Sequence, residues 1–92
     1  MKKSRVYVKV TGKVQGVLFR ATACDIAEQL AITGWVRNLD DGTVEAIAEG
    51  EKQKLEKFID WCSTGPKGAV VENINFEWTD YLGDFEKFMI VR

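Results

Sequence analysis

The chain has 92 residues, of which 46% are hydrophobic and 29% are charged, as expected of one small domain spanning residues 1–92. Thirteen basic and fourteen acidic residues give a net charge of −1, which argues against nucleic-acid binding through a broad basic surface. No apolar run approaches the length of a membrane span or has the form of a signal-peptide core. Composition therefore predicts a cytoplasmic protein with neither a membrane nor a nucleic acid as its partner.

Two cysteines and the lack of histidine restrict the metal and redox chemistry of the chain. Cys24 and Cys62 lie far apart, and without histidine they cannot complete a zinc site. A disulfide between them remains an alternative to reduced thiols packed on helices, which cytosolic conditions favour. We expect neither a metal nor a cofactor.

The first part of the chain alternates like a strand and then changes to helical spacing. In residues 5–12, Val6, Val8 and Val10 fall on one face, which predicts a strand. Apolar residues then recur at the spacing of an amphipathic helix, at Phe19, Ala23, Ile26, Ala27 and Leu30. Gly34 follows closely and is the residue expected to end this helix.

Five more segments complete the predicted order. They are strands at 35–39 and 43–50, a helix at 51–62, and strands at 70–78 and 85–92. The sequence Asp-Asp-Gly at 40–42 predicts a tight hairpin, and "TGPKG" ends the second helix.

The resulting order is β-α-β-β-α-β with a short extra C-terminal strand. It predicts the α+β, ferredoxin-like class, in which two helices pack on one face of an antiparallel sheet.

The junction between the first strand and the first helix, "GKVQGVLFR" (12–20), has the features of an anion site. The first N–H groups of a helix have no partner inside it, and the helix dipole adds partial positive charge there. Gly16 permits backbone angles that aim consecutive N–H groups at one anion, and Arg20 adds a planar guanidinium. The alternative, weighed equally from these residues, is that Gly16 makes a turn and Arg20 is a solvated helix residue. The lysine and hydroxyl residue of a nucleotide P-loop do not follow Gly16.

Read together, "GKVQGVLFR" and "TGWVRNLDDGTVEAIAEG" resemble the acylphosphatase family. The resemblance covers nearly the whole chain and includes both signature segments, "VQGVxFR" and "GWVxNxxDGxVE". It implies a metal-independent hydrolase on a ferredoxin-like fold, which converts an acyl phosphate to a carboxylate and inorganic phosphate.

The resemblance also assigns roles to residues. Arg20 and the backbone N–H groups from Gln15 to Arg20 (Gln15, Gly16, Val17, Leu18, Phe19 and Arg20) are expected to hold the phosphoryl group, and Asn38 to orient the attacking water. From the residues alone, the preferred interpretation of Asn38 is a turn former ahead of the hairpin. The chain departs from the family at Leu18, where many members have glycine, and at Ala31, where a glycine is often found near the end of the first helix.

This small set of residues suits the implied reaction. The leaving carboxylate needs no general acid, since the pKa of its conjugate acid is about 4. Phosphoryl transfer requires mainly positioning and charge stabilisation, which Arg20 and N–H groups supply.

Two other functions are compatible with this element order. Acylphosphatase-like domains also occur as acyl-phosphate-binding modules inside larger carbamoyl-transferring proteins, whereas the end of this chain at Arg92 favours a free-standing enzyme. We expect a monomer, because nothing in the sequence demands a larger assembly. RNA-recognition domains stack bases on aromatic residues of central strands, and "TVEAIAEG" has none. The sequence does not specify which acyl phosphate is the physiological substrate.

Overall fold

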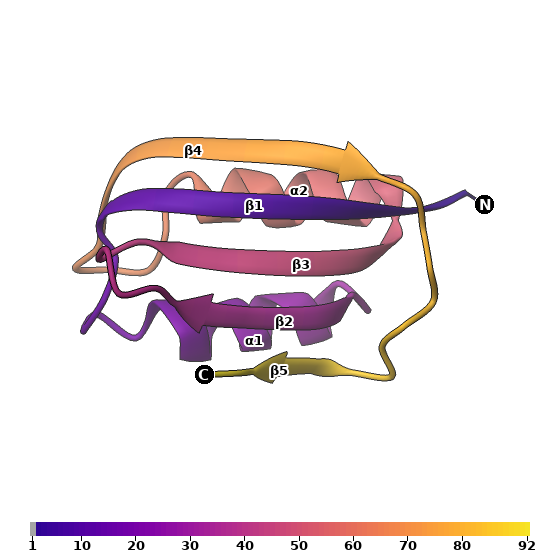
Figure 1. Cartoon of the computed structure of the whole chain (residues 1–92), viewed down its shortest axis with the longest axis horizontal. Coiled ribbons are helices and arrows are strands. Elements are labelled where there is room, and N and C mark those ends of the chain that lie inside the picture. The colour runs from indigo at the N-terminus through magenta and orange to yellow at the C-terminus, as the bar shows by residue number, and fades with distance from the viewer. Residues whose placement is uncertain (1) are drawn as a thin grey trace.

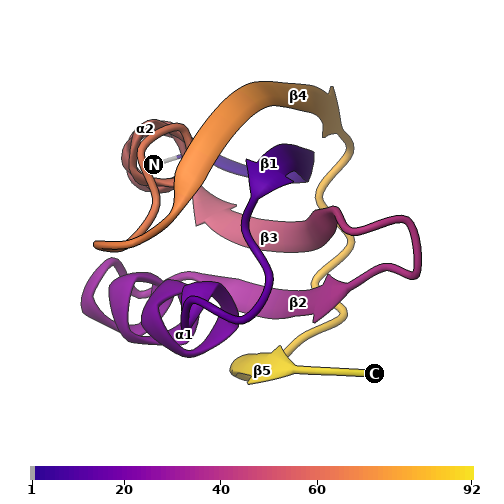
Figure 2. The ribbon, with the colours of Figure 1, turned by 90° about the vertical axis from the view of Figure 1, so that its left-hand side faces the viewer.

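A computed structural model describes residues 2–92 and contains the seven predicted elements in the predicted order. They are strand β1 (Lys3–Lys13), helix α1 (Phe19–Gln29), strands β2 (Thr33–Asn38) and β3 (Val44–Glu51), helix α2 (Lys52–Cys62), and strands β4 (Val70–Thr79) and β5 (Phe88–Ile90). The strands form one sheet in the order β4-β1-β3-β2-β5 (Figure 1). Both helices cover the same face of that sheet (Figure 2). The ferredoxin-like prediction is confirmed.

The sequence analysis predicted an antiparallel sheet, but the sheet is mixed because one pair of strands is parallel. β1 pairs antiparallel with β3 and β4, and β3 pairs antiparallel with β2. β5 instead pairs parallel with β2, from Gly34 opposite Phe88 to Val36 opposite Ile90. β1, β2 and β5 consequently run in the same direction and end at the same edge of the sheet, on the left in Figure 1.

The core lies between the sheet and the two helices. Alternation along β1 buries Val6, Val8 and Val10, because successive side chains of a strand point to opposite faces. The buried stripe of α2 faces them and consists of Leu55, Phe58, Ile59 and Cys62.

Helix α1 ends earlier than the sequence analysis predicted, and Gly34 is not the residue that ends it. The Ile32 N–H donates to the Ala27 carbonyl (2.9 Å) and the Ala31 N–H to the Glu28 carbonyl (3.1 Å), the two bonds of a Schellman motif. Ala31 therefore takes the left-handed position, with φ 57°. Gly34 lies inside β2, where a Cβ would overlap the Ile47 carbonyl oxygen of β3.

Candidate active site

The three strands that end at one edge of the sheet bring the predicted site residues together. The loop of residues 14–18 leaves β1 and enters α1, Asn38 is the last residue of β2, and Ile90 is the last residue of β5. Figure 2 views this end of the molecule directly. A cavity of about 230 Å³ lies between these elements, lined by Val14, Gly16, Leu18, Phe19, Arg20, Ala21, Asn38 and Ile90. A cavity of this volume accepts a small molecule.

The start of helix α1 lacks the residues that normally cap a helix. Leu18 occupies the N-cap position in a left-handed conformation (φ 64°) and makes no side-chain cap, and the first turn has no acidic residue. Among the described residues, nothing accepts a hydrogen bond from the N–H groups of residues 16–21. Leucine is among the poorest N-cap residues, so this terminus can bind an anion in place of a cap.

Arg20, the second residue of α1, is the one charged side chain among the described residues that line the cavity. It is half-buried, and no carboxylate within residues 2–92 forms a salt bridge with its guanidinium. The five N–H donors of that group are consequently available to a ligand. Because the whole chain has a net charge of −1, attraction of an anion to the cavity depends on this single guanidinium and not on a basic surface.

The Asn38 side chain does not serve the hairpin turn. Asp41 does so, because its Oδ1 accepts hydrogen bonds from the Thr43 N–H (3.0 Å) and the Thr43 hydroxyl. The Asn38 Oδ1 is buried and has no hydrogen-bond partner in the part of the chain that the structure describes. A buried polar atom without a partner costs about 1–3 kcal/mol, so the fold's own stability does not account for this asparagine.

Gln15 occupies a different position from the other loop residues. Its Nε2 donates to the backbone carbonyl oxygens of Leu39 (2.7 Å) and Thr43 (2.9 Å), the first and last residues of the turn between β2 and β3. The Gln15 side chain thereby ties the loop to the strand end that carries Asn38. Val17 packs against the core, and neither Gln15 nor Val17 is among the residues that line the cavity.

Phe19 lines the cavity with its side chain anchored in the core. It is buried and lies against Trp61 of α2, with ring centroids 5.0 Å apart. Val14, Ala21 and Ile90 also line the cavity and were not predicted from the sequence. Val14 and Ala21 are close in sequence to predicted residues, but no local pattern marks Ile90.

The two cysteines are free thiols and lie away from the cavity lining. Burial raises the pKa of the Cys62 thiol, and burial together with Asp25 raises the pKa of the Cys24 thiol. Both thiols therefore stay protonated at neutral pH, the form in which cysteine is a poor nucleophile. Within residues 2–92, no three histidine, cysteine, aspartate or glutamate side chains form a group suited to a metal ion, and no helix could cross a membrane.

Comparison with known proteins decides the family. The sequence profile of the acylphosphatase family matches residues 6–90. The chain belongs to the acylphosphatase family. An acylphosphatase of Pelotomaculum thermopropionicum is 49% identical over 90 residues, which cover 98% of each chain. Curated acylphosphatases of this similarity along nearly the whole chain make the protein a hydrolase, as the sequence had predicted.

Solved acylphosphatase structures have the same fold. The acylphosphatase from Coxiella burnetii is 39% identical, with a TM-score of 0.91, and the match covers 97% of this chain and 93% of that one. The acylphosphatase from Bacillus subtilis is 34% identical, with a TM-score of 0.93 and coverage of 97% and 99%. HypF from T. kodakarensis also matches, at 28% identity and a TM-score of 0.82, but only over 12% of its own length. This acylphosphatase thus matches whole acylphosphatases and one part of a larger protein.

Proposed function

We propose that this acylphosphatase binds the phosphoryl group of an acyl phosphate between the loop of residues 15–20 and the Arg20 guanidinium. The observation that carries the proposal is the uncapped start of α1, whose N–H groups have no partner among the described residues and lie beside Arg20. Backbone N–H groups and a guanidinium match the oxygens of a phosphoryl group, and they stabilise charge that develops there during transfer.

Asn38 positions the attacking water in this proposal. Its carboxamide offers one acceptor and two donors, so it can hold a water molecule but cannot remove a proton. The water attacks phosphorus, the bond from phosphorus to the acyl oxygen breaks, and the electron pair leaves with the carboxylate. The proton of the water passes to a phosphate oxygen, because no imidazole, amine or carboxylate lines the cavity among the described residues.

No metal takes part in this mechanism, because Arg20 and the N–H groups supply the charge stabilisation and the leaving group departs as a carboxylate. We propose further that the enzyme acts on a small acyl phosphate, which a cavity of about 230 Å³ accepts, and that it does so as a cytoplasmic monomer. Turnover of benzoyl phosphate in EDTA tests the first point, and gel filtration tests the second.

Arg20→Ala is the direct test of the phosphoryl site. We expect turnover of benzoyl phosphate to fall by a factor of about 100 to 1,000, the usual cost of losing one donor to a developing oxyanion. Inorganic phosphate should raise the Tm of the wild-type protein, because ligand binding to the folded state stabilises it, and should no longer do so in the variant.

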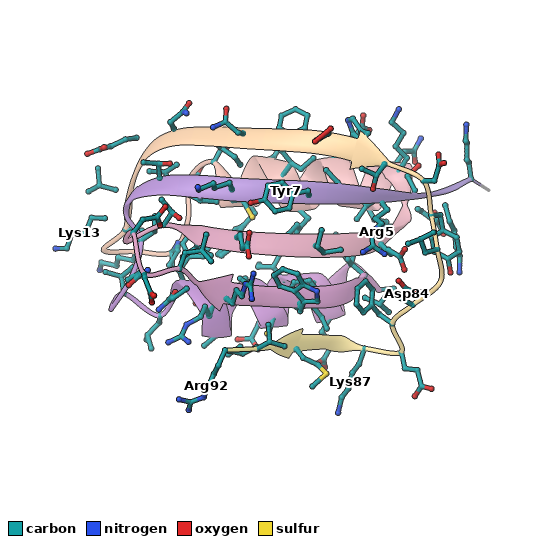
Figure 3. All side chains as sticks on the ribbon, in the orientation of Figure 1. Arg5, Tyr7, Lys13, Asp84, Lys87 and Arg92 are labelled. Atoms are coloured by element: carbon teal, nitrogen blue, oxygen red, sulfur yellow. The ribbon has the colours of Figure 1, made fainter. Side chains whose placement is uncertain are left out.

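Lys13→Ala is the matched control, since Lys13 lies at the same end of the sheet (labelled in Figure 3) but does not line the cavity. It removes the same charge and should retain activity and the response to phosphate. An Arg20→Ala variant that kept near-normal turnover would show that the phosphoryl site lies elsewhere.

A further inference from the structure

Two exposed aliphatic residues form the outer part of the cavity lining, and the fold does not explain them. Leu18 is 76% exposed and Ile90 is 44% exposed, although both are large apolar residues. They come from opposite ends of the chain, one from the loop before α1 and the other from the end of β5. We propose that Leu18 and Ile90 bind the acyl group of the substrate, so that the enzyme prefers acyl phosphates with a bulky apolar acyl group.

Leu18 strains the backbone without a matching gain in the stability of the fold. A residue other than glycine in the left-handed region costs about 1–2 kcal/mol, and Leu18 has φ 64°. Its side chain adds nothing to the core at this exposure, and it does not cap the helix. A residue that breaks a local rule without stabilising the fold is typical of a functional position.

The chemistry of the lining favours an apolar occupant. Val14 and Phe19 are buried and Ala21 offers only a methyl group, so the larger exposed aliphatic side chains of the cavity are Leu18 and Ile90. Arg20 is the one charged group among the described lining residues, and the proposed function assigns it to the phosphoryl group. An acyl group that extends from that phosphoryl group toward the rim meets two aliphatic side chains, and contact with an apolar group removes their surface from water.

Other exposed apolar residues lie outside the cavity lining and provide controls. Met89 is the neighbour of Ile90 in β5 and is similarly exposed, at 46%, but successive strand residues point to opposite faces of a sheet. Leu82 is a leucine exposed to 62% in the connection between β4 and β5. Substitution at Met89 or Leu82 removes a similar exposed side chain without touching the site.

The test compares kcat/KM for benzoyl phosphate with kcat/KM for acetyl phosphate. This inference rests on the proposed position of the phosphoryl group. We expect the ratio of the two values to fall by a factor of about 5 in Leu18→Ala and in Ile90→Ala, as for partial loss of an apolar contact. Leu82→Ala and Met89→Ala should leave the ratio as it is in the wild-type protein.

A positive charge at position 18 should shift the substrate preference from apolar to anionic acyl groups. Leu18→Lys should favour 1,3-bisphosphoglycerate, whose acyl group carries a second phosphate, over benzoyl phosphate by several-fold relative to wild type. A constant ratio in all Leu18 and Ile90 variants, with Arg20→Ala inactive, would overturn this inference and leave the phosphoryl site intact. Activity retained in Arg20→Ala would instead overturn the proposed function.

Discussion

At the scale of single residues, the site contains side chains that function explains better than stability does. Asn38 has a buried oxygen without a partner in residues 2–92, Leu18 has a strained backbone, and Arg20 forms no described salt bridge. In the proposed complex the attacking water can donate a hydrogen bond to the Asn38 oxygen, and the phosphoryl oxygens can accept hydrogen bonds from Arg20. The apolar acyl group can cover the exposed side chain of Leu18. Such strained or unpaired groups are common at active sites.

Asn38→Ala separates catalysis from stability. We expect kcat to fall by a factor of about 100 or more and the affinity for inorganic phosphate to change little, because the proposed function has Asn38 contact the water and not the phosphoryl group. The free energy of unfolding should stay the same or rise, since the substitution removes an unpaired buried polar atom. Kinetics and thermal denaturation check both expectations.

Asp41→Ala provides the opposite pattern. It removes the hydrogen bonds that hold the turn at Thr43, so Tm should fall with kcat nearly unchanged. If Asn38→Ala instead lost stability and kept its kcat, the asparagine would be a turn residue.

Ala31→Gly should stabilise the protein, because Ala31 takes the left-handed position after helix α1 (φ 57°). Glycine removes a cost of about 1 kcal/mol there, which for a domain of this size raises Tm by about 5 °C. Ala21→Gly, inside the same helix, should lower Tm by a similar amount. Equal effects of the two substitutions would contradict this interpretation of the helix end.

At the scale of elements, the site depends on how the loop of residues 14–18 is joined to the β2–β3 hairpin. The two hydrogen bonds of Gln15 hold them together, at 2.7 and 2.9 Å. The loop leads into the N–H groups at the start of α1, and the hairpin begins next to Asn38 at the end of β2. We therefore expect Gln15 to act as a positioning residue, since both donors of its side chain are already used.

Gln15→Met keeps the length of the side chain and removes its donors. We expect kcat to fall by a factor of about 10 to 100 in a folded variant, because small misplacements of reacting groups have effects of this size. Gln15→Glu should behave similarly at neutral pH, since a carboxylate cannot donate to the Leu39 and Thr43 carbonyls.

Acid should partly restore Gln15→Glu, because a protonated carboxyl group donates one hydrogen bond. The measurement is kcat of Gln15→Glu relative to wild type from pH 7 down to about pH 4. A relative kcat that does not rise as the pH falls would argue that Gln15 acts by packing alone.

At the scale of the whole molecule, one buried carboxylate binds the connection between β4 and β5 through hydrogen bonds. Glu49 in β3 accepts hydrogen bonds from the N–H groups of Leu82 (2.8 Å), Gly83 (3.3 Å) and Asp84 (3.2 Å). Arg5 of β1 forms salt bridges with both Glu49 and Asp84, each at 3.2 Å. The connection passes the ends of the strands on the right of Figure 1, where Figure 3 labels Arg5 and Asp84.

Glu49 should make the stability of the protein dependent on pH in the acid range. Burial raises the pKa of this carboxyl group, but the Leu82 N–H and the Arg5 guanidinium outweigh burial and hold the pKa below its ordinary value of 4.5. A carboxyl group whose pKa is lowered by folding stabilises the fold above about pH 4.5, and the contribution is lost as the pH falls through the folded pKa. The Tm of the wild-type protein should decline in that range.

Glu49→Gln should lower the free energy of unfolding at pH 7 by about 3 kcal/mol and flatten the acid dependence of Tm. Asp84→Asn is the control, since Asp84 is exposed and a surface ion pair contributes less than about 1 kcal/mol. Equal stability of Glu49→Gln and wild type at pH 7 would mean that the connection is held by other contacts.

The sequence by itself determined the elements, and it predicted the residues of the proposed phosphoryl site. Strand alternation and helical spacing are local patterns, so they predicted all seven elements and the buried faces of β1 and α2. Arg20 and Gly16 could be predicted as members of the proposed anion site because they are neighbours in the chain. The family resemblance added the proposed role of Asn38.

Only the tertiary structure decided the features that depend on long-range partners. The parallel pairing of β5 brings Ile90 to the cavity, and nothing in residues 85–92 specifies the direction of that pairing. The sequence analysis wrongly assigned Gly34 to the end of the helix. Position 34 requires glycine because the Ile47 carbonyl of β3 lies where a Cβ would be, and nothing in the neighbouring sequence shows this contact. The Gln15 side chain likewise joins carbonyls 24 and 28 residues away, a contact that no local spacing encodes.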